Sequence, residues 1–347
     1  MKRINWKKIV RRAVAVTGAF FVANLICAGY YFMPGWLERE GGATSAVWRP
    51  GGMISQRVEG CGVHTVDSNG YVNPNIPMKD NDYILVLGSS HTMAIEVPMG
   101  KKYVSLLNEW LSEDGELRVY NMAQHGHMFP ELVAGFGAAV EEFPNSSVVI
   151  LEINATLFSQ NSLEAALDQR MFGREESGAM RWESASFFER LSVVAKEMLP
   201  FVSYWKDKQL PFMIPDFGGA FGIVPNKEQE TENLEFDEAT YRRILEEIFA
   251  TMKECYQGEI IIVYHPPVEL NGDGMKLIRD PAQKVFEETC QRKGICFLDV
   301  GDAFLEEYEQ TYAVPYGFCN TTMGAGHLNQ TGHRIMAEEL YQLLKRG

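Results

Sequence analysis

A serine, a glycine, an asparagine and a histidine are placed along this chain where they could support acyl transfer. The serine is Ser90. It follows Gly88 and the apolar run Tyr83–Leu87, which predicts a buried parallel strand. Open α/β sheets keep their functional sites just beyond such strands. Taken alone, this stretch favours the interpretation that Ser89 or Ser90 caps the next helix. The other three residues favour a functional role for Ser90.

Acyl transfer requires a nucleophile, a base that takes its proton, donors for the oxyanion and a group that orients the base. Ser90 is the candidate nucleophile, and His327, just before the last predicted helix, is the candidate base. The backbone N–H groups of Ser90 and Gly126 and the side-chain amide of Asn154 are the candidate oxyanion donors. Gly126 and Asn154 each follow another predicted strand, so these residues should converge on one sheet edge.

This set of residues resembles the SGNH/GDSL hydrolase family. Gly88-Ser89-Ser90 stands where the family has Gly-Asp-Ser, and Gly126 and Asn154 stand at its glycine and asparagine. His327, in His-Leu-Asn-x-x-Gly-His, stands at its histidine. The resemblance covers roughly residues 80 to 347. It implies a flavodoxin-like α/β/α fold and cofactor-free serine esterase, lipase-like or O-acyltransferase chemistry.

Two positions depart from the family pattern. Ser89 replaces the aspartate of Gly-Asp-Ser, and Gly324 replaces the aspartate three residues before the histidine. Asn320, Asp299 or a backbone carbonyl could orient His327 instead, or Ser90 and His327 could act as a dyad. Loss of the orienting acid also keeps open a non-catalytic module that binds or assembles envelope polysaccharide.

The other histidines near this edge have simpler interpretations. His91, His125 and His127 are candidates for the substrate pocket. A metal-dependent hydrolase using these three is the alternative, but no carboxylate partner is assignable and no metal is expected. His265 could line the rim of the site, and His333 is expected to be structural.

Alternating strand and helix patterns predict the fold class. Five short apolar runs separated by amphipathic segments indicate a five-stranded parallel sheet covered by helices on both faces, a three-layer α/β/α sandwich. The predicted strands are Tyr83–Leu87, Arg118–Met122, Ser147–Ile153, Glu259–Tyr264 and Cys296–Val300. This domain is expected to span 81–347, with an insertion at about 160–232. Residues 34–80 have little periodicity and are interpreted as an extracytoplasmic stalk or lead-in.

The amino-terminal segment predicts a membrane anchor. Residues 1–12 contain six basic residues and no acidic one, and residues 13–33 are uncharged and long enough to span a bilayer. The positive-inside rule places the basic segment in the cytoplasm and the remainder outside. A cleaved signal peptide is the main alternative. The lipid bilayer is therefore an expected partner, contacted through 13–33.

Charge and composition narrow the function further. The net charge of −14 argues against nucleic acid as a partner. Cys290 and Cys296 could pair, although buried free thiols explain them equally well. Asn-x-Ser/Thr sequons around the predicted site favour a bacterial cell surface, because glycans there would block it. The sequence thus predicts transfer or hydrolysis of an O-acyl ester on an envelope glycan, with a membrane-bound acyl-transfer protein as a candidate partner.

Overall fold

The computed structural model describes residues 6–40, 46–74, 83–112, 118–172, 181–182, 199–201, 204 and 236–346. Most of the predicted insertion at about 160–232 lies outside these residues. Its described parts are the helix α5 (Gln160–Phe172), the short strand β9 (Arg181–Trp182), and residues 199–201 and 204.

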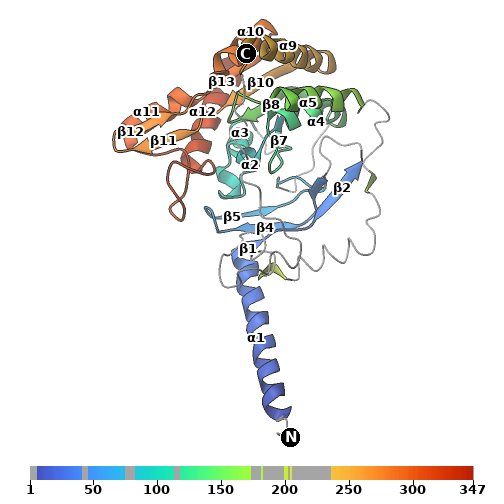
Figure 1. The fold of residues 1–347 in the computed structure, drawn as a ribbon, viewed down its shortest axis with the longest axis vertical. Helices are drawn as coiled ribbons and strands as arrows, with labels where there is room; N and C mark the ends of the chain where they lie inside the picture. Colours follow the sequence, from blue (N-terminus) through green and yellow to red (C-terminus); the bar gives the residue numbers. More distant parts are fainter. Residues whose placement is uncertain are drawn as a thin grey trace.

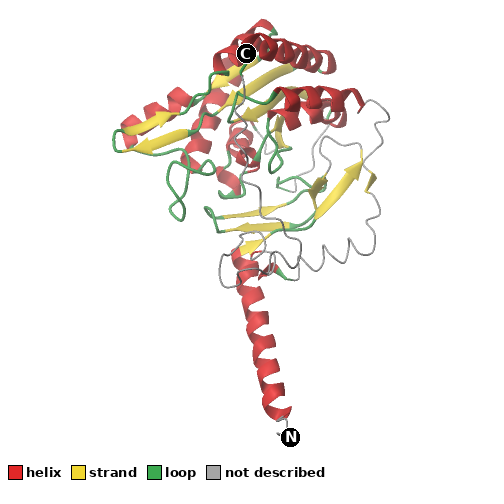
Figure 2. Cartoon of the chain, viewed as in Figure 1, coloured by secondary structure: helices red, strands yellow, loops and turns green. Residues whose placement is uncertain are grey.

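A five-stranded parallel sheet forms the centre of the molecule, as the sequence predicts. Its strand order is β13-β10-β8-β6-β7. The bounds are β6 Tyr83–Leu87, β7 Val119–Asn121, β8 Ser146–Ile153, β10 Glu259–Tyr264 and β13 Cys296–Asp299. Each predicted strand is present, with ends shifted by no more than one residue. The three-layer α/β/α fold class is therefore confirmed (Figure 2).

Helices cover both faces of this sheet because its strands are apolar on both sides. Leu85 and Leu87 of β6 belong to one core cluster, while Ile84 and Val86 belong to the other. The first cluster is covered by α4 (Phe129–Glu142), α5, α9 (Glu238–Cys255) and α10 (Gln283–Arg292). The second is covered by α3 (Tyr103–Leu111), α11 (Gly301–Thr311) and α12 (Gln330–Arg346). The short elements α2 (Ser90–Met93), η1 (Met99–Lys101), β11 (Val268–Asn271) and β12 (Gly274–Leu277) complete this unit.

The interpretation of residues 34–80 as a stalk or lead-in is wrong for the part that the structure describes. β1 (Tyr31–Phe32), β4 (Met53–Gln56) and β5 (Gly62–Thr65) form an antiparallel sheet, which we call the small sheet. β2 (Trp36–Glu40) and β3 (Ala46–Trp48) form another sheet with β9. A core cluster joins this region to the α/β unit: Trp48, Ile54, Val66, Val72, Met93, Ile95 and Ala123. Strands this short depend on such tertiary contacts, so they leave little periodicity in the sequence.

The amino-terminal helix α1 (Trp6–Tyr30) projects away from the rest of the chain (Figure 1). Among the described residues it is the one helix long and apolar enough to cross a membrane, and a signal sequence would satisfy the same criteria. Its apolar side chains, such as Phe21 and Ile26, are exposed. The predicted span of 13–33 is corrected at its end, because Tyr31 and Phe32 leave the helix and pair with β4.

Candidate active site

Ser90 is held at the carboxyl edge of the sheet by a tight turn after β6. A Cβ atom at Gly88 would lie 2.4 Å from Thr92 Oγ1 and 2.7 Å from Glu152 Oε2, so only glycine fits there. Ser89 caps α2, and its hydroxyl accepts a hydrogen bond from the His91 N–H. Ser90 is therefore the first residue of α2, and its side chain is half-buried at the surface of the site.

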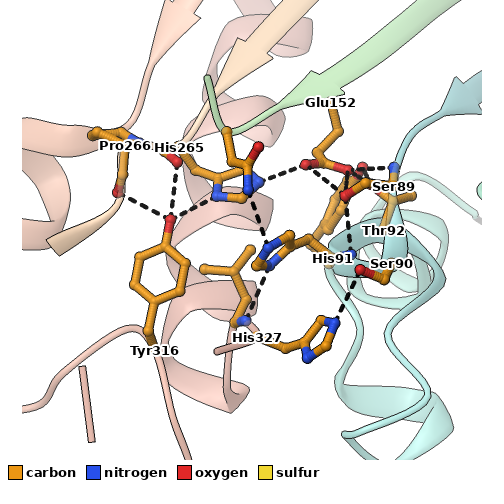
Figure 3. Close-up of polar contacts among 12 residues, drawn as sticks. Ser89, Ser90, His91, Thr92, Glu152, His265, Pro266, Tyr316 and His327 are labelled. Carbon is orange, nitrogen blue, oxygen red and sulfur yellow. Dashed lines mark hydrogen bonds and ion pairs between the residues drawn. The ribbon is translucent and has the colours of Figure 1, made fainter. Parts of the chain in front are cut away.

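Three side chains form a hydrogen-bonded series that begins at Ser90. The Ser90 hydroxyl lies 2.9 Å from Nε2 of His327, and Nδ1 of His327 lies 2.8 Å from Oε2 of Glu59. The other oxygen of Glu59 accepts a 2.8 Å bond from the His327 backbone N–H. The carboxylate thus fixes both the ring and the backbone of His327. Figure 3 shows the imidazole reaching Ser90 from the loop before α12.

Glu59 occupies the role that the sequence left to Asn320 or Asp299, and neither expectation is supported. Asp299 accepts hydrogen bonds from Arg279, Gln283 and the Gly301 N–H. Asn320 accepts a 2.9 Å bond from the Gly60 N–H and donates to the carbonyls of Arg57 and Gly60. It therefore holds the loop that carries Glu59 rather than contacting the imidazole itself.

Gly324, where the family pattern has an aspartate, has φ +83°. An L-residue would be strained there, and its Cβ would lie 3.2 Å from the Leu270 Cβ. The backbone at this position therefore disfavours the usual acid. Glu59, between β4 and β5, comes from the opposite end of the chain.

A second carboxylate lies beside the imidazole. Glu96 Oε1 is 3.8 Å from His327 Nδ1, and Glu96 Oε2 is buried without a hydrogen-bond partner among the described residues. Burial raises the pKa of Glu96. Ligand atoms of Glu59, Glu96 and His327 lie within 4.8 Å of one another, a spacing that could hold a metal ion. The 2.8 Å hydrogen bond between Glu59 and His327 explains most of this proximity without a metal ion.

The candidate oxyanion donors differ in their surroundings. Asn154 directly follows β8, and its amide nitrogen Nδ2 lies 3.3 Å from His91 Nε2. Gly126 lies in the exposed turn after β7 with φ +80° and open space at its α-carbon. Its approach to the oxyanion remains a prediction, as does the role of the Ser90 N–H.

The three histidines proposed for the substrate pocket have different environments. His91 is buried, and its Nδ1 accepts a hydrogen bond from the Leu328 N–H. His127 lines a small pocket together with Ser89 and Asn154, whereas His125 is exposed. Within the described part of the chain, the three do not form a metal-binding cluster.

A buried polar network beneath Ser89 was not predicted. Glu152 accepts hydrogen bonds from the Ser89 N–H and hydroxyl, from Thr92 Oγ1, and from His265 Nε2 at 2.6 Å (Figure 3). Burial opposes the negative charge of Glu152, but these bonds, above all the one from His265, hold its pKa at about 2. His265 is fully buried and also contacts the Tyr316 hydroxyl, so it does not line the rim. In the sequence, the one indication of this network is Glu152, a single glutamate inside the mostly apolar strand β8.

A comparison with protein-family models found no match, and neither did a comparison with curated proteins. Similar solved structures include LAE5, an alpha/beta hydrolase enzyme from the metagenome of Lake Arreo, Spain, with 16% identity and a TM-score of 0.40, covering 77% of this chain and 95% of that one. A lipolytic protein of the G-D-S-L family from Veillonella parvula DSM 2008 has 13% identity and a TM-score of 0.35, with 77% and 100% covered. A catalytic mutant of the acetylxylan esterase Axe2 from Geobacillus stearothermophilus has 15% identity and a TM-score of 0.38, with 77% and 94% covered. Identities and TM-scores this low say nothing about the activity of this chain. The fold class is therefore assigned from the strand order of the central sheet.

Proposed function

We propose that this chain is a serine-dependent esterase or O-acyltransferase. The observation that supports it is the hydrogen-bonded series from Ser90 through His327 to Glu59, with distances of 2.9 and 2.8 Å. A serine hydroxyl is a weak nucleophile unless a base removes its proton, and a histidine is an effective base when an acceptor at Nδ1 fixes its tautomer. Glu59 supplies that acceptor, which removes the main reason for a non-catalytic module.

The mechanism follows from these positions. Ser90 Oγ attacks the ester carbonyl while its proton passes to His327 Nε2, and Glu59 stabilises the resulting imidazolium. The Ser90 N–H, the Gly126 N–H and the Asn154 amide stabilise the oxyanion. The intermediate collapses to an acyl-serine, and His327 returns the proton to the leaving alcohol. Water or a sugar hydroxyl, deprotonated by His327, then attacks the acyl-serine and regenerates Ser90.

We further propose that α1 anchors the domain at the outer face of a bacterial membrane. The basic residues at the start of the chain favour a cytoplasmic amino terminus, and the exposed apolar surface of α1 fits a lipid environment. This location favours acylated cell-envelope glycans as substrates and a membrane-bound acyl-transfer protein as partner.

Labelling with a fluorophosphonate tests the nucleophile and the orientation together. A membrane-impermeant probe added to intact cells should label the full chain and the control Ser68→Ala, which changes an exposed serine in a turn, but not Ser90→Ala. Hydrolysis of an acetyl ester should fall at least about 10³-fold in Ser90→Ala. Unchanged turnover in that variant would refute the nucleophile, and labelling only after cell lysis would refute the orientation.

A further inference from the structure

His91 lies at the centre of the site but has no role in the proposed chemistry. It directly follows Ser90 on α2 and is 8% exposed. Its ring packs between those of His265 and His327, with centroid distances of 4.8 and 5.2 Å (Figure 3). A polar ring buried this completely should have both nitrogens hydrogen-bonded, and both are.

One of these bonds fixes the tautomer of His91. The Leu328 N–H lies 3.2 Å from His91 Nδ1, and a backbone N–H can only donate. Nδ1 must therefore be the unprotonated nitrogen, so the proton of the neutral ring resides on Nε2. Burial, followed by the charge of His265, keeps the pKa of His91 well below its ordinary value, which agrees with a neutral ring.

The second bond then determines how the Asn154 amide is turned. The amide nitrogen Nδ2 of Asn154 is placed 3.3 Å from His91 Nε2, an arrangement that would set two N–H groups against each other. Because Nε2 carries the proton, the amide must offer its oxygen to His91. The oxygen and nitrogen ends of an amide have nearly the same shape, so this orientation requires no change in packing. The NH₂ group of Asn154 is then turned away from His91.

We propose that His91 is a positioning residue that turns the Asn154 NH₂ group toward the oxyanion. This inference rests on the proposed function, since it assigns Asn154 as an oxyanion donor. The loop that carries the base supplies the bond that sets the tautomer, because Leu328 directly follows His327. Movement of that loop would therefore disturb the base and the oxyanion donor together.

Two substitutions of His91 separate its two bonds. His91→Asn can still accept the Leu328 N–H but is too short to donate to Asn154, whereas His91→Gln can reach Asn154 with a donor. We expect kcat for ester hydrolysis to fall about 10- to 100-fold in His91→Asn, with KM within about twofold, because one oxyanion donor loses its orientation. His91→Gln should recover part of that loss.

A double-mutant cycle distinguishes positioning from a general structural role. His91→Asn should cost little extra in an Asn154→Ala background, because the group it orients is already missing. If kcat of the double variant fell by the product of the two single fold losses, the inference would be overturned.

Nitrogen NMR of histidine-labelled full chain in detergent provides a readout that does not depend on activity. We expect the Nε2–H tautomer for His91, and protonation at Nδ1 would overturn the inference even if no ester is turned over. Absence of Ser90-dependent turnover in the unmodified chain, with the expected tautomer present, would instead refute the proposed function.

Discussion

At the level of single residues, the proposed pairing of Ser90 with His327 depends on Glu59. It accepts two hydrogen bonds from His327, one from the ring and one from the backbone. Both of its oxygens therefore face donors. A carboxylate meets this demand, whereas an amide has an acceptor at one end only.

Glu59→Gln should therefore lower kcat about 10³- to 10⁴-fold while KM changes little, because the NH₂ end of glutamine opposes one of the His327 donors and the base loses its orientation. Steady-state kinetics on a soluble acetyl ester would measure this loss. The matched variant is Glu96→Gln. It alters the neighbouring carboxylate, whose Oε1 lies 3.8 Å from His327 Nδ1, and should lower kcat by less than about tenfold. A larger loss in Glu96→Gln than in Glu59→Gln would transfer the orienting role to Glu96.

Residue types and order were sufficient to predict that Ser90, Asn154 and His327 lie at one edge of the sheet, because each lies just after or just before an element with a clear apolar pattern. Glu59 was not predictable in this way. It lies 268 positions before His327, between two strands of four residues each. Asn320, one of the candidates for orienting the base, instead hydrogen-bonds the loop that carries Glu59.

At the level of elements, the loop between β4 and β5 must be held still for Glu59 to reach the imidazole. Asn320 makes three hydrogen bonds to this loop, one with the Gly60 N–H and two with the carbonyls of Arg57 and Gly60. The Cys61 N–H adds a 2.8 Å bond to the Glu96 carbonyl. The position of the acid thus depends on contacts between the small sheet and the α/β unit.

Asn320→Ala should lower kcat about tenfold, less than Glu59→Gln, because the carboxylate remains but its loop loses three bonds. The control is Asn145→Ala, an exposed asparagine in the turn before β8, which should retain wild-type kinetics. Equal kinetics for the two variants would show that other contacts hold the loop.

The central elements were predictable because each repeats a simple pattern. β6 and β10 are buried almost throughout, and covering helices such as α9 and α12 each bury one apolar face. The helix α11 was missed because it begins two residues after β13 and most of its residues are charged or partly exposed. The small sheet was missed because its strands are stabilised by pairing and by the cluster around Ile54, not by their own periodicity.

At the level of the whole molecule, buried titratable groups should make the fold sensitive to acid. Burial lowers the pKa of His333 from 6.5 to about 3 and that of His64 to about 2. The unfolded chain takes up these protons below pH 6.5 and the folded chain does not, so stability falls as the pH decreases from that value. The carboxylate of Glu152, with its pKa lowered from 4.5 to about 2, adds a further loss below pH 4.5.

We therefore expect each buried neutral histidine to cost about 1 kcal/mol of stability at pH 5.5 relative to pH 7. Thermal unfolding of the full chain in detergent should show a midpoint that falls over this range. His333→Asn, which can still accept the Tyr103 N–H, should show a smaller fall. The same slope in both proteins would contradict this account of His333.

The position of the small sheet has a practical consequence for protein engineering. It joins the end of α1 to the α/β unit, since Ser55 and Arg57 both donate hydrogen bonds to the Gly29 carbonyl. A secreted form trimmed at residue 81, the boundary that the sequence pattern favours, would keep Ser90 and His327 but discard Glu59. Trimming immediately after the helix would preserve that carboxylate. The cloning boundary alone would thus decide whether a purified domain retains all three side chains of the proposed catalytic series.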